Sequence, residues 1–266
     1  MNPFKLHRAS TLEQAGDTFK RADEARYLAG GQTLIPVLKQ RLATPSDVVS
    51  LAGIAGLRSI KAGPSAVTIG AMTPHAEVAA SPEVRRLIPA LAELARGIGD
   101  PHVRNRGTLG GSVANNDPAA DYPAAVLGLA AVVRTTKREI AADDFFRGLF
   151  TTALDEGEII TAIDFPMPER AGYVKFPNPA SRYCLVGVMV AKGPAGVRVA
   201  VTGAGQDGVF RAEALETALT TSFAAETLAD IAIPHHGLMT DIHAGAAYRA
   251  HLIGVLARRA VAKAIG

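Results

Sequence analysis

The spacing of apolar residues over the first fifty positions predicts a small unit in which helices and strands alternate. Ser10-Thr-Leu-Glu13 has the pattern of a capping box, so a helix is expected from Thr11 to about Ala22. Pro36 is compatible with the first turn of a second helix. The other expected elements are strand 26–29, helix 33–42 and strand 47–51. This order of elements describes an α/β layer.

Between Leu57 and Pro168 the pattern predicts a second region of short strands and helices. Leu87, Leu91 and Leu94 recur at helical spacing, which predicts one long helix from Pro82 to Gly97. The other expected elements are strands 57–61, 66–70, 131–134, 138–141 and 158–165, and helix 124–130.

After Pro168 the pattern changes to three apolar runs that are typical of strands, followed by helices. We therefore place a domain boundary near 167–172 and divide the chain into residues 1–168, subdivided near 53–57, and residues 169–266. The last helix is expected to be long and amphipathic. The elements expected here are strands 173–176, 184–191 and 197–203, and helices 211–219, 224–231 and 241–265.

Composition excludes several classes of function. The net charge is only +3, and the Lys and Arg residues are dispersed, which argues against a dedicated nucleic-acid or membrane surface. The single cysteine, Cys184, excludes an internal disulfide and any cysteine-ligated iron–sulfur or zinc site within these residues, and its apolar run favours a buried structural thiol. The first residues lack an apolar signal core, so a cytoplasmic location is expected.

Two glycine pairs carry the main candidate chemistry. Gly30-Gly31 lies in the segment Ala29–Pro36, and Gly110-Gly111 lies in the segment Thr108–Pro123. A Gly-Gly turn presents backbone N–H groups that no Cβ shields, so two such turns can hold the two phosphates of a dinucleotide. The two pairs therefore predict a cofactor that contains a pyrophosphate.

Two carboxylates follow the second glycine pair and allow two interpretations. In one, Asp117 caps a turn or helix and Asp121 lies inside the fold. In the other, Gly110 and Gly111 admit a phosphate while Asp121 accepts a hydrogen bond from a sugar or flavin-chain hydroxyl. A carboxylate beside a pyrophosphate is unfavourable, so Asp121 is expected to face hydroxyls.

A third glycine-rich segment, Gly203-Ala-Gly-Gln-Asp-Gly208, matches the G-x-G-x-x-G pattern of dinucleotide-binding domains. The residues after it are mostly helical in pattern, whereas such a domain needs further parallel strands. We therefore expect the end of a hairpin or a strand-to-helix turn at this position.

Among the histidines, His102 lies between the long predicted helix and the second glycine pair and is the favoured candidate for a cofactor contact. His75 and the pair His235-His236 are expected to be structural or in a surface turn. Ser112 lacks the spacing of a nucleophile elbow, and no Ser/His/Asp arrangement stands out. The chain is therefore expected to hold a cofactor rather than perform chemistry with its own side chains.

At these residues the chain resembles the FAD-binding (medium) subunits of molybdenum hydroxylases, the family of xanthine dehydrogenase and aerobic carbon monoxide dehydrogenase. The likeness covers essentially the whole chain. It is strongest at Ala29–Pro36, at Thr108–Ser112 with Asp117–Pro123, and in the C-terminal stretch from Thr240. The segments around Asp117 and Asn178 favour the carbon monoxide dehydrogenase-like branch.

The resemblance implies a two-part FAD domain of the vanillyl-alcohol-oxidase (PCMH) type and a C-terminal α+β domain with a three-stranded antiparallel sheet. It assigns no catalytic residue, but it places Tyr183 beside the flavin ring, Lys175 in contact with the cofactor and Asp121 on its hydroxyls. The full set of implied or expected cofactor-binding residues is Ala29, Gly30, Gly31, Gln32, Thr33, Leu34, Ile98, His102, Thr108, Gly110, Gly111, Ser112, Asp117, Asp121, Ile160, Lys175 and Tyr183.

The resemblance also implies partners. A large subunit would carry the molybdenum–pterin centre and a small one two [2Fe–2S] clusters, while this chain binds FAD non-covalently and passes electrons to quinone, oxygen or NAD. The expected assembly is a dimer of three-subunit units, a heterohexamer, with no metal in this chain. Two alternatives are a stand-alone flavin oxidase or reductase and a non-catalytic nucleotide-binding scaffold.

Overall fold

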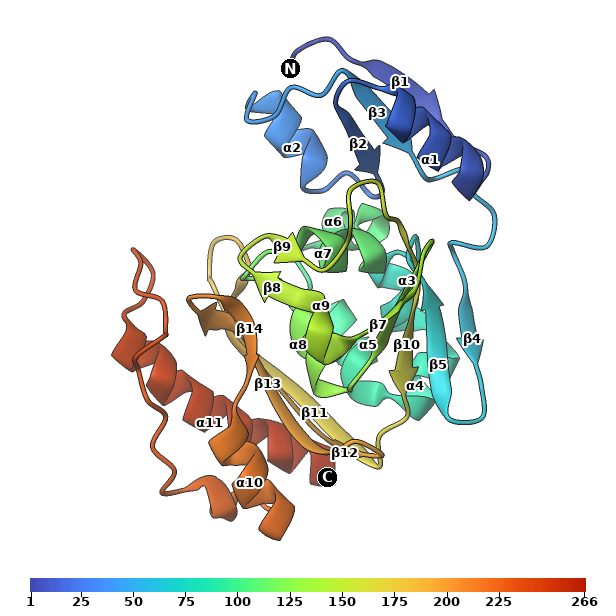
Figure 1. Cartoon of the computed structure of the whole chain (residues 1–266). Helices are drawn as coiled ribbons and strands as arrows, with labels where there is room; N and C mark the ends of the chain where they lie inside the picture. The colour runs from blue at the N-terminus through green and yellow to red at the C-terminus, as the bar shows by residue number, and fades with distance from the viewer.

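The chain begins with a small parallel sheet that stands apart from the other sheets (Figure 1). The computed structural model describes residues 1–266. The sheet has the order β1-β3-β2, and Val48 and Val49 of the central strand are fully buried. We call this sheet and its two helices the N-terminal unit; its elements are β1 (Lys5–Arg8), α1 (Leu12–Arg21), β2 (Ala25–Leu28), α2 (Leu34–Lys39) and β3 (Asp47–Ser50).

Two local predictions in the N-terminal unit need correction. The cap of α1 lies one residue later than expected, because the Thr11 hydroxyl accepts from the Gln14 N–H and the Gln14 side chain accepts from the Ser10 N–H. Gln14, and not Glu13, therefore supplies the side chain that reaches back to the Ser10 N–H. The strand β1 was not predicted; it forms because Lys5–Arg8 pairs in parallel with β3, a contact that local pattern does not indicate.

A five-stranded antiparallel sheet forms the middle of the molecule, in the order β4-β5-β10-β6-β7. The predicted long helix over 82–97 is wrong: Pro89 splits it, since the residue before a proline disfavours helical backbone and Ile88 has φ −141°. The elements are β4 (Ile60–Ala62), β5 (Ala66–Gly70), α3 (His75–Ala80), α4 (Pro82–Leu87), α5 (Pro89–Arg96), α6 (Pro101–Arg106), α7 (Leu109–Asn115), α8 (Tyr122–Gly128), β6 (Val132–Thr135), β7 (Glu139–Ala141), α9 (Ala142–Phe145), β8 (Phe146–Gly148), β9 (Thr151–Thr152) and β10 (Ile160–Pro166).

The last sheet has four strands, not the three expected, in the order β11-β12-β13-β14. The extra strand arises because Gly205 pairs with Gly208 in a tight hairpin, which confirms that the G-x-G-x-x-G segment is a hairpin end. The predicted helix 224–231 is only a short 3-10 turn, and the last helix begins at Ala246 rather than at 241. The elements are β11 (Arg170–Pro177), β12 (Cys184–Gly193), β13 (Gly196–Gly205), β14 (Gly208–Arg211), α10 (Glu213–Thr221), η1 (Glu226–Leu228) and α11 (Ala246–Ile265).

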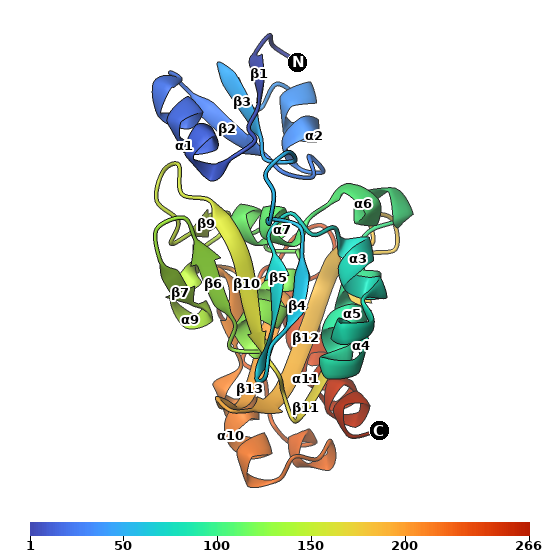
Figure 2. The ribbon, with the colours of Figure 1, turned by 90° about the vertical axis from the view of Figure 1, so that its right-hand side faces the viewer.

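Helix α8 joins the two larger sheets and thereby positions the turn that precedes it. All seven of its residues are buried, and it packs against β12, β13 and β14 on one side and α5 and α7 on the other. A Cβ on Gly128 would lie 2.7 Å from Met189 Cγ, so the helix approaches the four-stranded sheet closely. Helix α11 covers the opposite face of that sheet (Figures 1 and 2). None of the helices combines the length and the apolar character that crossing a membrane requires.

Candidate functional site

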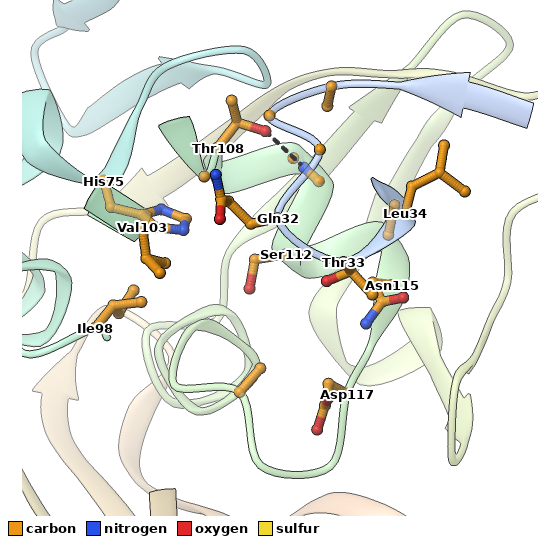
Figure 3. A pocket seen from close by; sticks show the side chains of 18 of the residues that line it. Gln32, Thr33, Leu34, His75, Ile98, Val103, Thr108, Ser112, Asn115 and Asp117 are labelled. Carbon is orange, nitrogen blue, oxygen red and sulfur yellow. Dashed lines mark hydrogen bonds between the residues drawn. The ribbon is translucent and has the colours of Figure 1, made fainter. Parts of the chain in front are cut away.

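A cavity of about 770 Å³ lies where the N-terminal unit, the helices of the middle region and the β11–β12 loop come together. Its volume is in the range of cofactor and small-molecule sites. Figure 3 shows its wall from close by. Both glycine pairs contribute to this wall, which therefore brings together two motifs about eighty residues apart in the chain. The lining residues fall within the segments 26–51, 71–75, 98–121, 154–160 and 180–183.

The first glycine pair forms a turn between β2 and α2 whose backbone donors are free. The N–H groups of residues 30–34 donate to no acceptor within the protein, although all five residues line the cavity. Consecutive N–H groups of this kind form a concave binding site for an anion. We call residues 30–34 the N–H cradle.

The cradle needs glycine at both positions, for different reasons. A Cβ on Gly30 would overlap the carbonyl oxygen of Arg106, a backbone atom that cannot turn away. Gly31 has φ +75°, in the left-handed region that side chains disfavour. The glycines therefore permit both the contact with the second motif and the curvature of the cradle.

The second glycine pair lies in the first turn of α7, and its donors are already used. Gly110 N donates to Ala71 O at 2.8 Å, and Gly111 N donates to the Thr108 hydroxyl at 3.2 Å (dashed in Figure 3). Ser112 N donates to Thr108 O at 3.0 Å. The expectation that both pairs present N–H groups to phosphates is thus wrong for the second pair, because capping and packing of α7 use those groups.

Close packing explains why the second pair consists of glycines. A Cβ on Gly110 would lie 2.5 Å from Ala71 Cβ, and a Cβ on Gly111 would lie 2.8 Å from Thr108 Oγ1 and 3.3 Å from Ala29 Cβ. The two motifs therefore touch each other directly, through Gly30 on Arg106 and Gly111 beside Ala29. Together they form one continuous wall of the cavity.

Four polar side chains along this wall make no hydrogen bond within the protein. They are supplied by Gln32 and Thr33 at the cradle and by Ser112 and Asn115 along α7, and Figure 3 shows them around the same space. Asp117 accepts from the Ala119 N–H at 2.8 Å and so closes the turn before α8, as one of the two interpretations predicted. The uncommitted groups could hydrogen-bond to hydroxyl or phosphate oxygens of a ligand.

Asp121 is 5% exposed; it borders the cavity and belongs to a buried polar cluster. Its carboxylate accepts from the Tyr173 hydroxyl at 2.6 Å and pairs with Lys175 Nζ at 3.0 Å. Burial raises the pKa of Asp121, while Lys175 and Tyr173 oppose this rise. Lys175 also donates to Arg182 O at 3.2 Å, so the cluster attaches the loop that carries Tyr183 to the wall. The Cys184 thiol lies beside Tyr173 and is buried, as expected, which raises its pKa.

Two of the predicted site residues do not line the cavity. His102 is exposed on α6, because that short helix turns its side chain outward. Lys175 lies behind Asp121 and contacts the wall rather than the open space. The predicted residues that do line the cavity are Ala29, Gly30, Gly31, Gln32, Thr33, Leu34, Ile98, Thr108, Gly110, Gly111, Ser112, Asp117, Asp121, Ile160 and Tyr183.

The sequence interpretation missed several lining residues. His75 was assigned a structural role, yet it borders the cavity together with Val103 (Figure 3). Asn115 is outside the predicted set of cofactor-binding residues, although it lies one helical turn after Gly111 and this spacing indicates it from the sequence. His75 and Val103 depend on how α3 and α6 pack, for which the local pattern holds no signal.

The comparisons with known proteins agree with this geometry. Residues 2–168 match the family described as FAD binding domain in molybdopterin dehydrogenase. The nicotine 6-hydroxylase medium subunit of Paenarthrobacter nicotinovorans is 35% identical over 96% of this chain and 95% of its own length. The carbon monoxide dehydrogenase medium chain of Afipia carboxidovorans is 32% identical over 98% and 96%.

The fold is similar as well. A chain of the reconstituted CO dehydrogenase from Oligotropha carboxidovorans superimposes with a TM-score of 0.91 and 31% identity, over 99% of this chain and 98% of that one. Quinoline 2-oxidoreductase from Pseudomonas putida 86 gives a TM-score of 0.87 at 27% identity, over 99% and 97%. This chain belongs to the FAD-binding family of the molybdopterin dehydrogenases. Its relatives are medium subunits of oxidoreductases, the flavoprotein component of the molybdenum hydroxylases.

Proposed function

We propose that this chain binds FAD in the cavity and serves as the electron-transfer subunit of a molybdenum hydroxylase complex. One observation carries the cofactor assignment: in a chain of an FAD-binding family, five consecutive residues that line a cavity of about 770 Å³ have N–H groups without a protein acceptor. The N–H cradle suits the charge of a pyrophosphate, and the volume suits a dinucleotide. The residues present therefore fit the group.

The wall suggests how each part of FAD would be held. Residues 30–34 would donate to the pyrophosphate, and Thr33, Ser112 and Asn115 would hydrogen-bond to hydroxyl or phosphate oxygens. The flavin ring would lie towards Ile98 and Tyr183, which line the cavity on α5–α6 and β11–β12 loops. The other half would extend along the N-terminal unit, towards Leu34 and strand β10 at Ile160.

Asp121 has an indirect role in this arrangement. Its two oxygens are engaged by Tyr173 and Lys175, so we assign it to holding the wall and the Tyr183 loop rather than to a primary contact with cofactor hydroxyls. Bound FAD would supply the redox chemistry, by accepting electrons and releasing them to an acceptor. The protein groups would orient the ring and set its electrostatic surroundings.

Partners and organisation follow from the family and stay proposals. We place this chain beside a large molybdenum–pterin subunit and a small subunit with [2Fe–2S] clusters, in a cytoplasmic heterohexamer that passes electrons to quinone, oxygen or NAD. Relatives named for nicotine and for carbon monoxide match at similar identity, which supports a substrate chosen outside this chain. We also propose domains at 1–168, of PCMH type and subdivided near 53–57, and at 169–266.

The proposal is tested by titrating the purified full chain with FAD, and then by adding reduced partner subunits. We expect one FAD per chain, with quenching of flavin fluorescence, and bleaching of the flavin absorbance when the iron–sulfur partner is reduced. A chain that takes up no FAD, alone or with its partners, would contradict the cofactor assignment. Tight FAD binding without reduction by the partner would instead favour the scaffold alternative.

A further inference from the structure

His75 begins helix α3 and is held beneath the wall formed by the second glycine motif. Its backbone N donates to Gly107 O at 3.0 Å, and Pro74, in extended backbone, precedes it. The imidazole packs on the Gly107 backbone so closely that a Cβ there would lie 2.6 Å from Nε2. On another side the Tyr122 ring lies 5.3 Å away, centroid to centroid. These contacts give the ring a fixed orientation.

Neither nitrogen of this fixed ring has a hydrogen-bond partner in the protein. The residue is 4% exposed, and Nδ1 is fully buried without a partner. Burial and the neighbouring Arg104 charge lower the pKa of His75 to about 4, so the ring is neutral at physiological pH. A neutral imidazole has one donor and one acceptor nitrogen, and leaving both unpaired is unfavourable.

The position of His75 indicates what could satisfy it. The residue lines the cavity, and Figure 3 shows it beside Ile98 and Val103, on the opposite side of the cavity from Leu34 and Asn115. The ligand groups that reach this side are therefore those of one half of a dinucleotide whose phosphates lie on the N–H cradle. Since Ile98 marks the flavin end in the proposed function, this half is the flavin.

We propose that His75 is a cofactor-contacting residue that hydrogen-bonds, through its neutral imidazole, to a polar atom of the flavin half of FAD. This inference rests on the proposed function. Carbonyl oxygens and the N–H of the flavin ring, and the ribityl hydroxyls, all offer the complementary donors or acceptors. His75 thus replaces His102 as the histidine of the cofactor site.

The test compares two ligands on three variants of the full chain. ADP shares the adenosine and pyrophosphate of FAD but lacks the flavin, so it reports on the cradle alone. His75→Leu removes both nitrogens, while His75→Gln keeps a polar amide near the position of Nε2. His102→Leu, at the exposed histidine of α6, is the matched control.

We expect His75→Leu to weaken FAD binding by about tenfold or more and to leave ADP binding unchanged. His75→Gln should restore FAD binding to within about threefold of the wild type, a rescue that a purely structural role would not require. His102→Leu should change neither ligand. The visible spectrum of bound FAD should shift only in the His75 variants.

Unchanged FAD affinity in His75→Leu would overturn the inference, and so would equal losses of FAD and ADP affinity. Far-ultraviolet circular dichroism and thermal unfolding distinguish a misfolded variant, and His75→Gln then carries the test. Failure of the proposed function would be seen separately, because the wild-type chain would then bind neither FAD nor ADP.

Discussion

The two glycine pairs look alike in the sequence but use their backbones in opposite ways. Residues 30–34 line the cavity and their N–H groups donate to nothing in the protein, whereas Gly110 and Gly111 donate to Ala71 O and to the Thr108 hydroxyl. The first pair is therefore available to a ligand, and the second holds a helix in place. A glycine pair indicates close approach of backbone, but its hydrogen bonds decide whether a ligand or the protein is the partner.

The two glycine motifs contact each other, and this contact allows the second motif to support the first. Gly30 packs on the Arg106 carbonyl and Ala29 lies beside Gly111, so the rigid second motif supports the open first one. An anion cradle without such support would lose binding energy to ordering of the turn. The comparison yields four predictions, which separate damage to the cradle from damage to its support.

The largest effect is expected for Gly30→Ala. The added Cβ would overlap the Arg106 carbonyl oxygen, so the turn must move and the N–H cradle is lost. We expect FAD affinity to fall by at least about 100-fold, near 3 kcal/mol, in equilibrium titration. Gly16→Ala is the matched control, since nothing lies within 4 Å of its Cβ, and it should leave FAD affinity unchanged. Wild-type affinity in Gly30→Ala would show that the cradle does not hold the cofactor.

Gly110→Ala should lower the stability of the chain more than its affinity for FAD, the opposite of what we expect for Gly30→Ala. Its Cβ would lie 2.5 Å from Ala71 Cβ in the packed interior, and overpacking of this kind costs about 2–3 kcal/mol. Urea unfolding of the chain without FAD should show this loss, while the folded variant keeps FAD affinity to within about tenfold. Lost FAD affinity at unchanged stability would instead make the second pair a ligand site after all.

Acid should lower the free energy of unfolding through His75. This residue packs on Gly107, just before the second glycine pair. Its pKa is about 4 in the folded chain against about 6.5 in an unfolded one, so the unfolded state binds the extra proton between these values. Folding stability contributed by the neutral ring is thus complete above pH 6.5 and declines as the pH falls towards 4.

The measurement compares urea unfolding of wild type and His75→Leu at pH 7.5 and pH 5. Between pH 7.5 and pH 5, the wild type should lose about 2 kcal/mol of unfolding free energy relative to His75→Leu. A constant difference at both pH values would show that the pKa of His75 is the same in the folded and unfolded chain, and a shift in favour of the wild type would show that the folded chain holds the ring protonated.

Much of the site could be predicted from the sequence because its determinants are local. Gly31 supplies a left-handed turn directly after a strand, and Thr108 caps the helix that follows it, so the residues themselves predict both turns. Family resemblance added Ile98, Ile160 and Tyr183, all of which line the cavity. Most of the predicted site residues therefore line the cavity.

The errors arose where a distant partner decides the outcome. The donor of Gly110 goes to Ala71, strand β1 requires β3, and strand β14 requires β13. His102 was preferred over His75 because position along the chain carries no information on burial. The break at Pro89 is different, because a proline inside a helical pattern is a local signal that predicts a break.

The smallest predicted effect concerns the Thr108 hydroxyl, which accepts a hydrogen bond from an N–H group of the second glycine pair. Thr108 is buried and its Oγ1 accepts from the Gly111 N–H at 3.2 Å, which caps α7. Thr108→Ala should lower the unfolding free energy by about 1 kcal/mol, as for other helix caps, and Thr108→Ser should restore most of it because the hydroxyl is retained. The alanine variant also frees the Gly111 N–H beside the cavity. If that donor then strengthens FAD or ADP binding, the two glycine pairs differ only in which acceptor reaches them first; if binding is unchanged, the geometry of α7 keeps the second pair away from the phosphates.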